Sequence, residues 1–287
     1  KLGNDNLINL NMATHYSHYF KLKHRDFIDK GVYNGFLDKD SLLHIDPLLL
    51  KNCSIPEFEK SYNNFLFYFQ QLVPLVNYTK ENNLDDRFFR QIVKRFTMSE
   101  IPNTGLGYSK ESSYGKGISG ALANQLALSA FEIISAGLID PEIFGLMQLI
   151  EDKVGADRIS DMTLYILRKD FLAYTQRIAT ELCIPTKKYV FSYDEIFYVP
   201  FYKNKPIHFI PMQLLADLPV AHDYDDIDKV CNYNNKLKKK IADIIGVAWS
   251  QYKDYKKKDW KKLILGDQKC YNAAIQFYRG LQGIPYN

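Results

Sequence analysis

The spacing of the apolar residues changes at Pro185, and this change is the strongest constraint on what the chain can fold into. Before Pro185, apolar residues recur at intervals of three and four, most clearly over residues 58–72, as on one face of a helix. After it, "KKYVFSYDEIFYVPFYKNKPIHFIP" is rich in Val, Ile, Phe and Tyr and alternates in part, which is typical of strands. We therefore expect a mainly α protein, a helical bundle with a small β-hairpin or sheet insert near residues 187–211.

Pro185 also separates two candidate domains. Residues 1–185 form the predicted helical domain, and residues 186–287 the hairpin with a basic helical segment packed on it, unless the two form one single domain. With 287 residues, of which 46% are hydrophobic and 14% aromatic, the chain can bury a sizeable core. It begins without Met, so we expect it to be a piece of a longer protein.

Composition favours a cytoplasmic protein. The four cysteines lie far apart and form no Cys-x-x-Cys pair, as expected for reduced thiols. No apolar run approaches the roughly 20 residues that cross a membrane, so we expect no membrane partner. The first residues do not resemble a signal peptide. A net charge of +4 permits DNA or RNA as a partner without requiring it.

The acid-rich stretch "EDKVGADRISDMT", residues 151–163, is the first candidate site. In one interpretation Asp157, Asp161 and Glu151 coordinate a magnesium ion, which prefers oxygen ligands, and Arg158 acts beside the two aspartates in catalysis or holds a phosphate. In the other, Asp157 caps the start of a long helix, where negative charge is favourable. Both interpretations remain open from the sequence.

A Gly/Ser-rich loop, "GLGYSKESSYGKGISG", precedes the next predicted helix and is the second candidate site. Glycines allow a ligand to approach the backbone, and Lys116 could bind a phosphate at the start of the helix. The loop does not match the P-loop pattern, because Lys116 is followed by Gly117. The alternative is a surface loop that covers a site.

Lysines alternate with aromatic residues near the end of the chain, in "YKDYKKKDWKK". Lys256, Lys257 and Lys258 could contact phosphates, and Trp260 could stack on a base. A solvated helix surface explains the same lysines. The acidic run "HDYDDID", residues 222–228, could bind a metal or begin a helix, and it lacks the EF-hand pattern.

Three short blocks, "HIDPLLL…PEF", "GADRISDMT" and "IPMQLLADLPVAHDYDDIDKV", resemble a family of large, poorly characterised bacterial proteins. That family is associated with genome defence and with a restriction-endonuclease-like domain further along the chain. The resemblance implies a bacterial protein linked to DNA or RNA. It assigns no catalytic residue, and the nuclease motif itself is absent from this chain.

These features together predict a cytoplasmic bacterial module that acts on or senses nucleic acid, in phage or genome defence. If it is an enzyme, metal-dependent phosphodiester hydrolysis is the expected reaction. The first alternative is a non-catalytic scaffold that binds other domains or subunits of a larger protein. The second is a nucleotide-binding sensor that uses the Gly/Ser loop.

Overall fold

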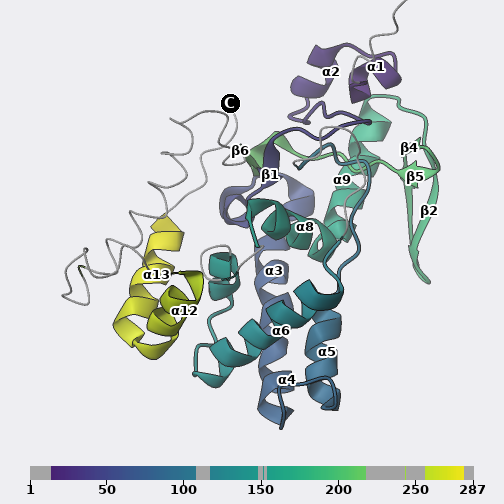
Figure 1. The fold of residues 1–287 in the computed structure, drawn as a ribbon. Helices are drawn as coiled ribbons and strands as arrows, with labels where there is room; N and C mark the ends of the chain where they lie inside the picture. The colour runs from purple at the N-terminus through teal and green to yellow at the C-terminus, as the bar shows by residue number, and fades with distance from the viewer. Residues whose placement is uncertain are drawn as a thin grey trace, which may run out of the picture.

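Helices make up most of the folded chain. The structure, a computed structural model, describes residues 14–107, 117–147, 151, 154–217, 243 and 256–280. Among these residues the strands pair only as small two-stranded antiparallel sheets. The predicted fold class, mainly α with a small β insert, is therefore confirmed (Figure 1).

The α-helices form a central body with smaller groups at its edges (Figure 1). The first four are α1 (Tyr16–Tyr19), α2 (His24–Ile28), α3 (Ser61–Gln70) and α4 (Leu72–Tyr78). The next four are α5 (Arg87–Phe96), α6 (Gly120–Ser135), α8 (Ala156–Ile166) and α9 (Arg168–Glu181). The last pair is α12 (Lys257–Gly266) and α13 (Gln268–Gly280).

Short 3-10 helices and strands connect this body. The 3-10 helices are η1 (Pro47–Asn52), η2 (Pro56–Phe58), η3 (Pro141–Leu146) and η4 (Met212–Leu214). The strands are β1 (Leu43–Ile45), β2 (Lys187–Ser192), β3 (Glu195–Val199), β4 (Phe201–Tyr202), β5 (Lys205–Pro206) and β6 (Leu215–Asp217).

Several helix boundaries follow from local sequence. Pro47 occupies the first position of η1, and the Asp46 carboxylate accepts a hydrogen bond from the Leu48 amide at 2.9 Å. The Asp86 carboxylate caps α5 in the same way, accepting from two amides of the first turn. Gly137, with a φ of +83°, follows the end of α6, where only glycine adopts this conformation readily.

Two predicted long helices are each divided in the structure. The segment from residue 157 to Pro185 forms α8 and α9, because Leu167 leaves helical geometry at φ −100° and ψ 18°. The sequence also favours a helix over residues 15–29, and the structure divides that segment into α1 and α2. Hydrophobic spacing alone does not locate such breaks, since the apolar face continues across them.

The predicted β insert is two hairpins followed by a buried extended segment. Strands β2 and β3 pair with Tyr189 opposite Phe197, and β4 pairs with β5 through a turn at residues 203–204. The run "PIHFIP", which follows "KNK", predicts a third strand. The structure pairs its first residue, Pro206, in β5 and places residues 207–210 in the core outside any sheet ladder, which corrects most of that prediction.

A pair of strands that the sequence did not predict joins two distant parts of the chain. Strand β1 is antiparallel to β6, with His44 opposite Ala216. Helix α8 packs on β1, where the Ile45 amide donates to the buried Ser160 hydroxyl at 3.0 Å. This contact fixes how α8 is rotated about its axis.

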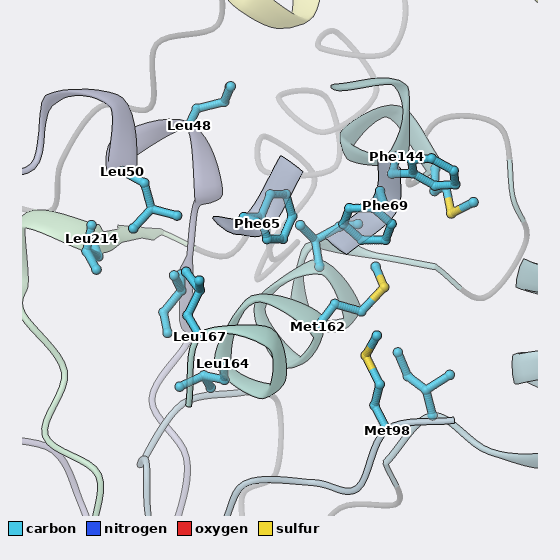
Figure 2. Close-up of a cluster of buried hydrophobic side chains, with 14 of the residues drawn as sticks. Leu48, Leu50, Phe65, Phe69, Met98, Phe144, Met162, Leu164, Leu167 and Leu214 are labelled. Carbon is cyan, nitrogen blue, oxygen red and sulfur yellow. The ribbon is translucent and has the colours of Figure 1, made fainter. Parts of the chain in front are cut away.

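The larger of two hydrophobic clusters extends through most of the described chain, and a smaller one lies between α9 and β3. Phe65 and Phe69 of α3 lie near Met162 of α8, and the Phe69 ring stacks on Phe144 at 4.6 Å between centroids (Figure 2). The larger cluster also contains Trp260 of α12, so it has residues from both sides of Pro185. The division of the chain there into two domains stays a prediction.

Candidate functional site

The first turn of α8 carries the acidic residues singled out in the sequence. The helix begins at Ala156, and the residue before it, Gly155, has extended geometry and no side chain to form a cap. The prediction that Asp157 caps this helix is therefore wrong, because Asp157 lies inside the first turn. Any Cβ on Gly155 would lie 2.7 Å from a carboxylate oxygen of Asp157, so the glycine makes room for that carboxylate.

Arg158 lies between two carboxylates. Its Nη1 donates to Asp161 Oδ2 at 3.2 Å, and its Nε lies 3.8 Å from Asp157 Oδ2. The three side chains are between 28% and 33% exposed. They are therefore neither in bulk water nor enclosed, and a ligand approaching from solvent can reach them.

Asp161 is the carboxyl group of this cluster whose protonation changes near neutral pH. Loss of solvent contact raises the pKa of Asp161 to about 7, and the negative charges of Asp157 and Glu100 add to the rise while Arg158 opposes it. At pH 7 both protonated and ionised forms are therefore present. A carboxyl in this state can accept or donate a proton.

Glu100, at the base of the Gly/Ser loop, lies close enough for its charge to act on Asp161. It follows α5 by four residues, just after Met98 pairs with Ile118 in an antiparallel bridge that ties the two ends of the loop together. Gly117 packs directly against the Met98 carbonyl, where a Cβ would clash. The structure thus joins two candidate sites that the sequence presented separately.

Sequence reasoning did not identify Glu100. Its only local signal was a carboxylate at the entrance to the loop, in "MSEIPNTG". Lys116 and the loop residues 108–116 lie outside the described residues, as do residues 222–228. Phosphate binding by Lys116 and nucleotide sensing by this loop therefore stay predictions.

Glu151 belongs to a different part of the molecule. Its carboxylate lies 2.7 Å from Lys261 Nζ, accepts from Gln125 at 3.0 Å and bonds the Ser129 hydroxyl. These contacts attach α12 to α6. Within the described residues no group of three or more His, Cys, Asp or Glu side chains could hold a metal ion. The predicted magnesium set is therefore not gathered in one place, and magnesium binding stays a prediction.

The lysines near residue 256 differ in their surroundings. Lys257 Nζ donates to the Glu151 carbonyl at 2.8 Å, so its ammonium helps to hold α12 in place. Lys256 and Lys258 are exposed, and their contact with nucleic acid stays a prediction. Trp260 is only 3% exposed, because the amphipathic α12 turns it inward with Ile264. Stacking of Trp260 on a base is not compatible with this burial.

The comparisons with known proteins identify the family alone. Residues 21–222 match the model of a domain of unknown function, DUF8370, and the chain belongs to this family. The match includes Glu100 and the first turn of α8 and excludes α12. No curated protein and no solved structure matches. Among the described residues, no helix has the length and apolar character needed to span a membrane.

Proposed function

We propose that this domain acts on nucleic acid in the bacterial cytoplasm, in phage or genome defence, and that the cluster around Asp161 cleaves phosphodiester bonds. The observation that carries the proposal is the ion pair of Arg158 with Asp161, about one-third exposed, together with the charge of Glu100 acting on Asp161 from a separate segment. The resemblance to bacterial genome-defence proteins supports the choice of substrate and setting.

Phosphodiester hydrolysis at this site requires a proton acceptor beside a positively charged group. In the proposed reaction a water oxygen attacks phosphorus, its proton passes to ionised Asp161, and the bond from phosphorus to the leaving oxygen breaks. The leaving oxygen takes a proton from solvent. Arg158 offsets the charge that develops on the phosphoryl oxygens. The pKa of Asp161 near 7 suits a base that works at neutral pH.

Replacing Asp161 with Asn should lower the rate of nucleic-acid cleavage by about 100- to 10,000-fold, the usual range for a positioned acid or base. The assay follows labelled single-stranded DNA, duplex DNA and RNA, each with magnesium and with a chelator. Cleavage by the wild type should increase as the pH rises through about 7, as Asp161 ionises.

A matched control is available in the next helix. Asp170 of α9 is also partly buried with a raised pKa, mainly through loss of solvent, and it accepts from the Ser61 hydroxyl at 2.6 Å. Asp170→Asn changes a similar group away from Arg158 and should retain cleavage within a few-fold. Equal losses in both variants, or a wild type that cleaves none of the substrates in either condition, would contradict the proposal.

A second candidate function, protein binding without catalysis, is favoured by the outer face of the β2–β3 hairpin. Its inner face packs on α9 through Phe197 and Val199. The outer face leaves Val190 59% and Tyr198 54% exposed, with Ile196 between them. In the described residues β2 pairs with β3 alone, so its other edge can pair with the same edge of a second copy.

Under this second function the chain should self-associate, and Val190→Glu should weaken that association at least tenfold by placing a charge in the apolar centre of the interface. Light scattering after gel filtration over a range of concentrations measures the effect. Lys203→Glu, at an exposed position in the turn between β4 and β5, is the control for adding an acid outside this face. A wild type that is monomeric at every concentration rules out this role.

A further inference from the structure

Helix α5 presents an uninterrupted line of positive charge. Its sequence, "RFFRQIVKRF", contains four basic residues and no acidic one. Arg87, Arg90 and Lys94 are exposed and lie three and four residues apart, so they share one face. Seven residues of helix extend about 10 Å, so the three charges lie at intervals that suit successive phosphates on a strand.

These cations are not neutralised by neighbouring acids. Among the described residues, no carboxylate forms an ion pair with the three exposed residues of α5. The nearest acid in sequence, Asp86, uses its carboxylate to cap the helix. Arg90 is held by main-chain carbonyls of the preceding turn, at 2.7 Å from Leu84 and 3.1 Å from Asp85.

Aromatic rings lie beside the start of this line. The Arg87 guanidinium lies 4.5 Å from the centre of the Phe88 ring, and Phe88 stacks with Tyr78 at 5.5 Å between centroids. The Tyr78 side chain is 66% exposed. An exposed ring beside arginines that form no ion pair is an arrangement in which the bases of a single strand can stack on the ring while their phosphates contact the cations.

The line of charge ends near the candidate active site. After α5 the chain continues through Met98 to Glu100, which acts electrostatically on Asp161. Glu100 is the sixth residue after Lys94, so their Cα atoms lie at most about 20 Å apart. Figure 1 shows α5 rising from α4 toward the level of α6 and α8. A strand bound along α5 would therefore be directed toward the cluster around Asp161.

We infer that the exposed face of α5, with Tyr78 at its start, binds single-stranded nucleic acid and delivers it to the cluster around Asp161. The second half of this inference rests on the proposed function, and the first half does not. The positive charge and the exposed ring of Tyr78 do not distinguish the two sugars, so single-stranded DNA and single-stranded RNA are both expected ligands.

The opposite face of α5 argues against a membrane as the negatively charged partner. A basic amphipathic helix that binds membranes inserts its apolar face among the lipids. Here that face consists of Phe89, Ile92 and Phe96, which are at most 1% exposed and belong to the hydrophobic core. Only the charged face remains available.

The test measures binding separately from cleavage. Every protein carries Asp161→Asn, and the change in fluorescence anisotropy of labelled oligo(dT), oligo(U) and duplex DNA gives the affinity. Adding Arg87→Gln and Lys94→Gln should weaken binding of both single strands roughly tenfold at low salt. The slope of log affinity against log salt should become shallower by about 1.4, since each phosphate contact to a single strand contributes about 0.7.

The control removes the same charge from another surface. Lys187→Gln with Lys188→Gln neutralises two exposed lysines of β2 and should leave affinity and salt slope unchanged. Equal losses from α5 and β2, tighter binding of duplex DNA than of single strands, equal binding to anionic vesicles, or no binding would each overturn the inference. If the wild-type protein cleaves no substrate but binding still depends on α5, the binding surface is upheld and the proposed function is rejected.

Discussion

Replacing Lys261 with Met should lower the free energy of unfolding by about 3–5 kcal/mol, because the change leaves a buried carboxylate without its cation. Lys261 Nζ lies 2.7 Å from Glu151 and 2.6 Å from Glu132. The Glu151 side chain is only 7% exposed, whereas Glu132 is 50% exposed and can be solvated. Urea unfolding followed by circular dichroism measures the loss.

The double variant Lys261→Met with Glu151→Gln should recover most of that stability. An amide in place of the carboxylate no longer needs a cation and keeps a partner in Gln125. The neighbouring Lys262 is exposed, and Lys262→Met should change stability by less than about 0.5 kcal/mol. If the double variant were less stable than the single one, an interaction other than this ion pair would hold α12 in place.

The same experiment separates two roles for Glu151. If Glu151 holds α12 against α6, magnesium should have no effect on the stability of Lys261→Met. If it coordinates a metal, removal of the competing ammonium should let magnesium stabilise the variant by mass action. The structure favours the first role, because Glu151 and the aspartates of α8 have different partners.

Much of the helical fold could be predicted because the signals are local. Apolar spacing located the helices of the body, and short polar or imino residues such as Asp86 and Pro47 marked where helices begin. Such signals act within four or five residues, so a single sequence contains them in full. The hairpin β2–β3 was predicted for the same reason, since its strands are adjacent in the chain.

The remaining features depend on partners that are distant in sequence. Strand β1 pairs with β6, about 170 residues later, and Glu151 pairs with Lys261, 110 residues later. Neither short strand has a pattern of its own that indicates a partner. Contacts of this kind are set by how the helices pack together, which hydrophobic spacing does not specify.

The residues of the candidate site could be predicted only in part, for the same reason. An acid-rich string predicted one site, but the structure divides it: Glu151 joins α12, while Asp157 and Asp161 face Arg158. The carboxylate that completes the cluster, Glu100, comes from 61 residues before Asp161. Residue types therefore indicated which chemistry to look for, and the fold decided which residues meet.

His208 lies in the buried extended segment that follows β5. Its side chain has no exposure, and its Nδ1 lies 3.3 Å from the Pro102 carbonyl. A carbonyl can only accept a hydrogen bond, so Nδ1 carries the proton in the neutral ring. Nε2 has no hydrogen-bond partner among the described residues. Protonating this nitrogen would place an unpaired charge in the core.

The pKa of His208 accordingly falls from 6.5 to about 3, first through burial and then through the positive charge of Arg168. Between these two values the unfolded chain binds a proton that the folded protein does not. Stability from this group is therefore present above pH 6.5 and decreases as the pH falls toward 3. The full loss is on the order of 3–5 kcal/mol.

Asp161 opposes this effect over part of the same range. Its folded pKa, about 7, exceeds the value of 3.8 for an isolated carboxyl, so the folded state binds the proton more tightly and this group lowers stability as the pH rises from 3.8 to 7. The pH dependence of the wild type is thus a sum of opposing contributions. Only a comparison of variants separates them.

His208→Gln, which keeps an amide that can donate to the Pro102 carbonyl, should flatten the fall in unfolding free energy between pH 7 and pH 4. Urea unfolding at a series of pH values measures this, and the informative quantity is the difference between variant and wild type at each pH. His18→Gln, at an exposed position of α1, is the control for removing a histidine. A constant difference across the series would mean that the pKa of His208 is the same in the folded and unfolded states, so that burial does not hold the ring neutral.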